Sequence, residues 1–66
     1  MSKIYCLTKL GRRVYRNGSL SEEEMRVVGH LRENKSASDD QLEVVGGSRW
    51  LLGGLERRGM IKELTT

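Results

Sequence analysis

The stretch Ser48–Leu64, SRWLLGGLERRGMIKEL, decides the fold of this chain. Ser48 can accept a hydrogen bond from a backbone N–H of a first helical turn, and Gly59 can adopt the left-handed conformation that ends helices. Three apolar residues between them share one stripe of that helix: Leu51, Leu52 and Leu55. The sequence therefore predicts a helix between Ser48 and Gly59, followed directly by a short strand at residues 60–64.

Length and composition limit the number of domains, the size of the core and the kinds of site that this chain can form. The 66 residues predict one domain, residues 1–66, and a chain of this length buries only about 60% of the surface that its unfolded form exposes. Cys6 is the only cysteine, which excludes an intramolecular disulfide and a cysteine-based zinc site. The lone thiol, the lack of a signal peptide and the lack of an apolar run of roughly 20 residues predict a cytoplasmic protein with no membrane partner.

The net charge of +3 is unevenly distributed. Residues 1–20 carry five basic residues and no acidic one, residues 21–45 carry three and seven, and residues 46–66 carry four and two. Basic ends around an acidic middle favour a polyanionic partner. The densest basic cluster consists of Arg12, Arg13 and Arg16. Such a cluster either contacts phosphates or forms an ordinary solvated face.

Two elements are predicted near the N-terminus. Residues Lys3–Thr8 are rich in β-forming residues and predict a strand. Thr8 can cap a helix over Lys9–Arg16, with Leu10 and Val14 facing the core. The Asn-Gly dipeptide that follows is a turn signal and should end this helix.

Two further helices have clear N-terminal signals. Ser21 and Glu24 form a Ser-x-x-Glu capping box for a helix that ends near Asn34. Residues 36–38 are predicted to be a connector, and the last of them caps a shorter helix that runs to about Val45. The residues of these two helices expected to face the core are Met25, Val27, Val28, Leu31, Leu42 and Val45. The predicted class is mainly α with a small β-sheet (α+β), in the order strand, four helices, strand.

The chain lacks the side chains that most enzymes need. His30 is the only histidine, and a catalytic or metal-binding role would require partners that the sequence does not supply. Neither Gly46-Gly47 nor Gly53-Gly54 belongs to a nucleotide-binding loop pattern. We therefore expect no enzyme activity, no catalytic residue, no metal, no cofactor and no small-molecule substrate.

The predicted helix after Ser48 also presents a surface opposite its leucines. The residues that turn outward or lie on the flanks are Arg49, Trp50, Gly53, Gly54, Arg57 and Arg58. Two glycines inside a helix each cost about 1 kcal/mol relative to alanine. Either this face contacts DNA or a twin subunit, or Trp50 closes the rim of the core and the glycines make room for a neighbouring helix.

The order of these elements resembles the winged helix-turn-helix family. Its three helices are similar to the predicted helices Ser21–Asn34, Ser38–Val45 and Ser48–Arg58, and Met60–Leu64 resembles a strand of the wing. Residues 5–12, YCLTKLGR, resemble the Y-x-L-T-x-x-G-R/K segment that ends the wing and opens the C-terminal helix in many winged-helix regulators.

In this chain the YCLTKLGR segment precedes the three helices, so the resemblance implies a circularly permuted order. Lys3–Thr8 would then pair antiparallel with Met60–Thr65, which gives both strands hydrogen bonds that neither has alone. The alternative is that the chain joins the tail of one lost repeat to a second repeat.

The resemblance implies a small DNA-binding protein, either a transcription regulator or a chromatin-type protein, that contacts duplex DNA largely through phosphates and acts as a monomer or a homodimer. The residues that it assigns to DNA binding by position are Ser48, Arg49, Trp50 and Arg57. The basic residues Arg12, Arg13, Arg16 and Arg58 complete the predicted DNA-binding set as candidate phosphate contacts. The alternative is a protein–protein interaction or dimerisation module that uses the Trp50/Gly53/Gly54 face without nucleic acid. RNA binding is a third hypothesis, against which the low net charge and the few free aromatic residues argue.

Overall fold

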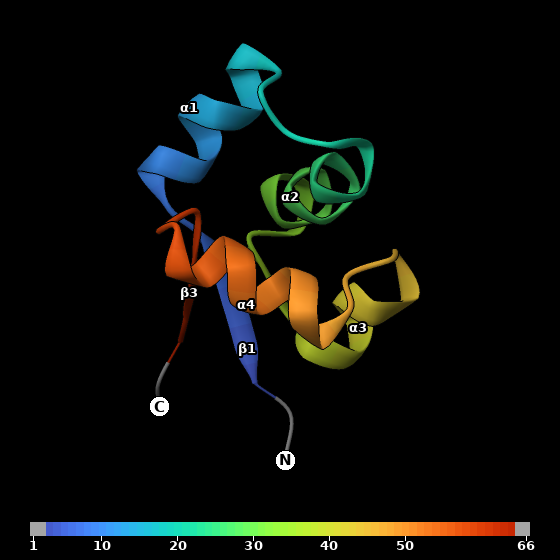
Figure 1. Ribbon diagram of the computed structural model, residues 1–66. Coiled ribbons are helices and arrows are strands. Elements are labelled where there is room, and N and C mark those ends of the chain that lie inside the picture. Colours follow the sequence, from blue (N-terminus) through green and yellow to red (C-terminus); the bar gives the residue numbers. More distant parts are fainter. Residues whose placement is uncertain (1–2, 65–66) are drawn as a thin grey trace.

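The computed structural model describes residues 3–64, which form four helices and three strands (Figure 1). Their order is β1 (Ile4–Leu7), α1 (Lys9–Asn17), α2 (Glu22–Asn34), β2 (Ser36–Ser38), α3 (Asp39–Val44), α4 (Arg49–Arg57) and β3 (Ile61–Glu63). The predicted class, mainly helical with a small sheet, is confirmed. Within the described range no helix has both the length and the apolar character needed to cross a membrane.

The three strands form one antiparallel sheet in the order β2-β1-β3, with β1 in the centre. Tyr5 of β1 lies opposite Ala37 of β2 on one side and opposite Glu63 of β3 on the other. A further hydrogen bond from the Leu64 N–H to the Ile4 carbonyl (2.7 Å) extends the pairing of β1 with β3. The N-terminal end of β1 and the C-terminal end of β3 therefore lie side by side (Figure 1).

The predicted pairing of Lys3–Thr8 with Met60–Thr65 is confirmed over β1 and β3, whereas Thr65 lies outside the described residues. The prediction of a connector at residues 36–38 is wrong, because these residues form β2. Two serines around one alanine give no β-forming pattern, and the strand exists because its backbone pairs with β1. Ala37, between the serines, is buried in the core.

Hydroxyl side chains cap the helices as predicted. The four N-cap residues, each accepting a hydrogen bond from the N–H three positions later, are Thr8, Ser21, Ser38 and Ser48. In α2 and α3 the side-chain oxygen of the third helical residue, Glu24 or Gln41, accepts a hydrogen bond from the N-cap N–H, which completes a capping box. Gly18 ends α1 in the left-handed conformation, with φ of 71°. These local bonds set the helix boundaries.

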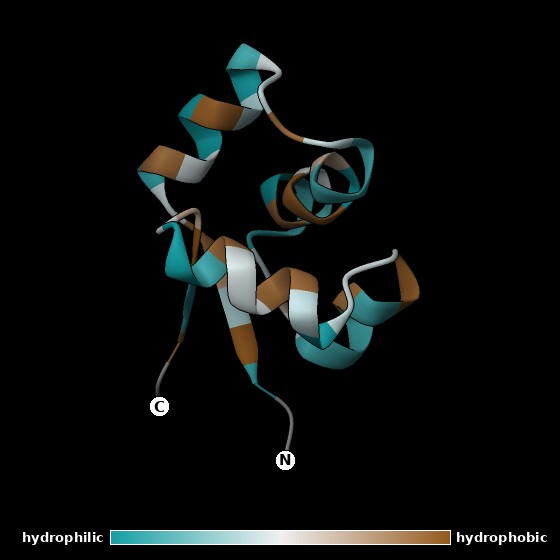
Figure 2. Cartoon of the chain, in the orientation of Figure 1, coloured by the Kyte–Doolittle hydropathy of each residue, from teal (hydrophilic) through white to brown (hydrophobic). Residues whose placement is uncertain are grey.

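The core lies where α2, α3 and α4 meet one face of the sheet. Its buried residues are Tyr5, Leu7, Val27, Val28, Leu31, Ala37, Leu42, Leu51, Leu52, Leu55, Met60 and Ile61. Met25, which was expected inside, is only half-buried, and Val45 packs against the edge of the core. Apolar segments, brown in Figure 2, alternate with hydrophilic ones along the helices, as one-sided burial requires.

The start of α1 is fastened to the turn between α4 and β3. The Thr8 N–H donates to the Met60 carbonyl (3.1 Å), and the Thr8 hydroxyl lies 2.6 Å from the Gly59 carbonyl. A Cβ on Gly11 would lie 2.2 Å from the Met60 carbonyl oxygen, so only glycine allows this approach. The prediction that Leu10 faces the core is therefore wrong: Gly11 takes the inward position, and Leu10 is 44% exposed.

Candidate nucleic-acid interface

Helix α4 buries its leucines and exposes its single tryptophan. Leu51, Leu52 and Leu55 are buried, whereas Trp50 is 85% exposed. The outward direction that the leucine stripe predicts for Trp50 is confirmed, and the alternative, in which Trp50 closes the rim of the core, is wrong. A large apolar ring thus stands in solvent beside the N-terminus of α4.

Gly53 and Gly54 lie about one helical turn beyond Trp50. A Cβ on either glycine would have no heavy atom within 4 Å, so the interpretation that they make room for a neighbouring helix is wrong. Neither glycine has a positive φ, so neither conformation requires glycine. Together they leave a strip of helix backbone without side chains, and this strip lowers the stability of α4 relative to alanine.

A shallow hollow covers this strip, and we call it the α4 hollow. It extends from Trp50 over the two glycines toward the C-terminal end of the helix. Its charged lining comprises Arg49, Arg57 and Arg58 of the α4 segment and Glu24 of α2. The α4 hollow therefore combines an apolar wall, an open floor and a mostly cationic edge.

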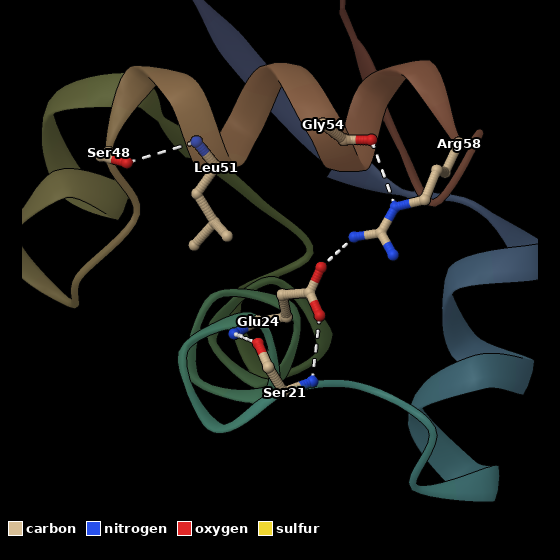
Figure 3. A network of polar contacts seen from close by, with 6 residues as sticks. All are labelled: Ser21, Glu24, Ser48, Leu51, Gly54 and Arg58. Atoms are coloured by element: carbon tan, nitrogen blue, oxygen red, sulfur yellow. Dashed lines mark hydrogen bonds and ion pairs between the residues drawn. The ribbon is translucent and has the colours of Figure 1, made fainter.

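Two residues that line the α4 hollow form an ion pair with each other (Figure 3). The Arg58 guanidinium pairs with the Glu24 carboxylate and also lies 3.4 Å, through Nε, from the Gly54 carbonyl. The other Glu24 oxygen accepts a hydrogen bond from the Ser21 N–H (2.9 Å). Arg58, assigned to DNA binding from the sequence, is thus held by an intramolecular partner. The pair ties the start of α2 to the end of α4.

The remaining predicted residues of α4 differ in their surroundings. Ser48 caps the helix, its hydroxyl accepting from the Leu51 N–H (3.2 Å; Figure 3). Arg49 and Arg57 are exposed, and neither forms an ion pair within residues 3–64. Ser48 therefore has a structural task, while these two arginines keep their charge available to a ligand.

Arg49 also borders a second hollow, toward α3 and the buried Tyr5. Burial raises the pKa of the Tyr5 phenol above its ordinary value of 10.0, and nearby carboxylates, chiefly Glu56, raise it further. The positive charge of Arg49 lowers the Tyr5 pKa and so opposes this shift. Arg49 therefore lies between the α4 hollow and a more acidic surface.

The arginines of α1 face a different part of the molecule. A hollow between α1 and α2 is lined by Arg12, Tyr15, Arg16, Arg32 and Glu33, and we call it the α1–α2 hollow. The Arg32 guanidinium lies 5.6 Å from the centre of the Tyr15 ring, within the range of a cation–π contact. Arg13 is exposed but does not line this hollow. Sequence reasoning missed Arg32 because only the packing of α1 on α2 brings it beside the α1 arginines.

Residues with catalytic or metal-binding potential stay apart. No group of three His, Cys, Asp or Glu side chains within residues 3–64 is placed to hold a metal ion. His30 is half-buried, with its ring nitrogen 3.5 Å from the Asn34 side-chain amide. Cys6 is a half-buried free thiol on β1. The α4 and α1–α2 hollows carry most of the exposed arginines that were predicted to bind DNA.

Comparison with known proteins assigns no family to this chain. It matches no protein-family model, no curated protein and no solved structure. A functional proposal therefore rests on the order of its elements and on the α4 and α1–α2 hollows.

Proposed function

We propose that this chain is a small DNA-binding protein of the winged-helix type, with its elements in circularly permuted order. Joining β3 to β1 would give the order helix, strand, helix, helix, strand, strand, helix. In that order α4 is the third helix of the trio and leads into β3 and β1, which pair as the two strands of a wing would. The YCLTKLGR segment spans β1 and the start of α1, where the family resemblance expects the end of the wing and the next helix.

The observation that carries the functional part is the outward face of α4. There a solvent-exposed Trp50 stands between Arg49 and Arg57, neither of which has an ion-pair partner within the described chain. In helix-turn-helix proteins the corresponding helix enters the groove of DNA. Cationic side chains around an apolar ring suit a ligand that presents phosphates beside less polar surfaces.

The α1–α2 hollow supplies a second set of phosphate contacts. The lining of this hollow contains three arginines, Arg12, Arg16 and Arg32, and one acidic residue, Glu33. Arginines that neutralise DNA phosphates release counterions, and the logarithm of affinity then falls by about 0.9 per contact for each unit of log salt. Contacts from both hollows should therefore give a slope of log affinity against log salt that corresponds to several phosphate contacts.

Dimerisation through α4 is the alternative, and the charges on that face disfavour it. A twofold pairing would place Trp50 of one copy over the glycines of the other, but it would also bring Arg49 and Arg57 of both copies together. The acid that lines this face, Glu24, is already paired with Arg58. Like charges without compensation oppose such an interface, whereas a polyanion is attracted to it.

Binding of short random-sequence duplex DNA at several salt concentrations tests the proposal. We expect a Kd well below 1 mM at low salt, on the order of micromolar or tighter, and an affinity that falls steeply as the salt concentration rises. Replacing Arg12 and Arg16 together by alanine should weaken binding to all sequences equally. The matched control is Arg26→Ala, which removes a charge that is already paired with Glu22. Millimolar affinity at low salt, or affinity indifferent to salt, contradicts the proposal.

Sedimentation without DNA tests the alternative. Because Trp50 is the only tryptophan, its emission reports on the α4 face directly. A blue shift that grows with protein concentration, together with a dimeric sedimentation coefficient, would favour dimerisation. Quenching of Trp50 by DNA in a monomeric protein supports DNA binding.

A further inference from the structure

The outward face of α4 carries few side chains that could read the edges of paired bases. Direct readout in a groove requires side chains that donate or accept hydrogen bonds along the helix that enters it. The central outward positions of α4 are Gly53 and Gly54, which have no side chain. Contact with an intact groove would thus be limited to Trp50 and the two free arginines.

The same face suits a flat apolar ligand. Trp50 is exposed, and the space over Gly53 and Gly54 is open, so a planar ring can lie against the indole without displacing any side chain. Every nucleobase has such a face, and stacking on an aromatic side chain tolerates any base. In an intact duplex the neighbouring bases cover that face, whereas an extruded base exposes it.

The charges around the α4 hollow indicate where the phosphates of such a ligand would lie. Arg49 and Arg57 have no ion-pair partner within residues 3–64 and attract phosphate. The Glu24 carboxylate is paired with Arg58, and this pair forms part of the lining of the α4 hollow. An apolar wall beside free cations matches the two parts of a nucleotide, its base and its phosphate.

We infer that the α4 hollow binds an unpaired base, which stacks on Trp50, and that the preferred substrate is duplex DNA with an extruded base. This inference rests on the proposed function and names the substrate class of the same surface. The α1–α2 hollow holds the phosphates of the flanking duplex, and this contact is indifferent to the extruded base.

The experiment compares two short labelled duplexes that differ only by one bulged base. Fluorescence anisotropy with the whole chain gives both affinities, and the emission of Trp50 is recorded at saturation. Stacking of one base on an aromatic side chain is typically worth about 5- to 150-fold in affinity, so the bulged duplex should bind about tenfold tighter. It should also quench Trp50 more strongly than the fully paired duplex does.

Variants separate stacking from charge. Trp50→Phe should keep most of the preference for the bulged duplex, and Trp50→Ala should abolish it while leaving salt-dependent binding of the paired duplex. Gly53→Leu should fill the α4 hollow and abolish the preference too, and folding should persist because the new side chain meets no neighbour at its Cβ. The control is Val44→Ala, since Val44 is equally exposed but lies on α3.

Equal affinities for the two duplexes, with equal Trp50 emission, overturn the inference. If both duplexes then still bind with steep salt dependence, the proposed function stands and only the extruded base is lost. If neither duplex binds, the proposed function fails and the inference fails with it. An unchanged preference in both Trp50→Ala and Gly53→Leu also overturns the inference, because it would place the extruded base elsewhere.

Discussion

Gly53 and Gly54 stand in the middle of α4, and replacing both by alanine is expected to stabilise the protein. Alanine is favoured over glycine in a helix interior by about 0.8–1.0 kcal/mol, because glycine loses more backbone freedom on folding. Neither glycine has a positive φ, and an added Cβ meets no heavy atom within 4 Å at either position. No steric penalty therefore offsets the gain.

The two gains should nearly add, because consecutive positions on a helix do not face each other. The double variant should thus raise the free energy of unfolding by about 1.5–2 kcal/mol. In a domain of this size, 1 kcal/mol corresponds to roughly 4–8 °C, so Tm should rise by about 10 °C. A gain of this size is large for a small domain, whose whole stability is rarely more than several kcal/mol.

Thermal and urea unfolding, both followed by far-UV circular dichroism, measure this gain. The matched control is Gly11→Ala, which should have the opposite sign. Its Cβ would lie 2.2 Å from the Met60 carbonyl oxygen and 2.6 Å from the Leu7 side chain, so we expect a loss of about 3 kcal/mol or an unfolded chain. A double variant no more stable than the wild type would refute the claim that the strip over Gly53 and Gly54 is open.

Three further outcomes are expected. Because the pKa of Tyr5 is raised, the folded state keeps the phenolic proton at pH values where the unfolded chain has released it. The free energy of unfolding should therefore fall as pH rises above about 10. Tyr5→Phe should flatten that fall, as measured by urea unfolding between about pH 9 and pH 11. Glu24→Gln should lower the free energy of unfolding by less than about 1 kcal/mol, because it removes the partly exposed ion pair with Arg58 but keeps a side chain that can cap α2. Glu24→Ala removes the cap as well and should lower it measurably more in the same assay. Arg32→Ala should lower the salt slope of duplex binding by about 0.9, whereas Arg26→Ala should not change it.

The helices were predictable because their signals are local. A capping hydrogen bond joins residues three positions apart, so Ser21 with Glu24 identifies the start of α2 without knowledge of the fold. β2 was missed for the opposite reason, since its backbone partners lie on β1, far away in sequence. Periodicity likewise failed at Leu10, where the close approach of Gly11 to Met60 decides which side of α1 faces inward.

The candidate site was predictable in part. The leucine stripe of α4 was enough to turn Trp50, Arg49 and Arg57 outward, and the structure places them around one hollow. It was not enough for Arg58, because the Glu24 that holds it comes from a helix 34 residues earlier. Arg32 lies beside the α1 arginines only because α1 packs against α2, and the sequence pattern of either helix alone does not predict this packing.

The central position of β1 has a consequence for synthesis. β1 leaves the ribosome before either of its neighbours, and its second edge stays unpaired until β3 has been made. Until then its backbone groups are open to pairing with any other extended chain. Without β1, moreover, β2 and β3 would face each other across a gap of two strand spacings, about 9–10 Å, which backbone hydrogen bonds cannot bridge. β1 is thus the strand on which the entire sheet depends, and it acquires its last partner only after β3 has been synthesised.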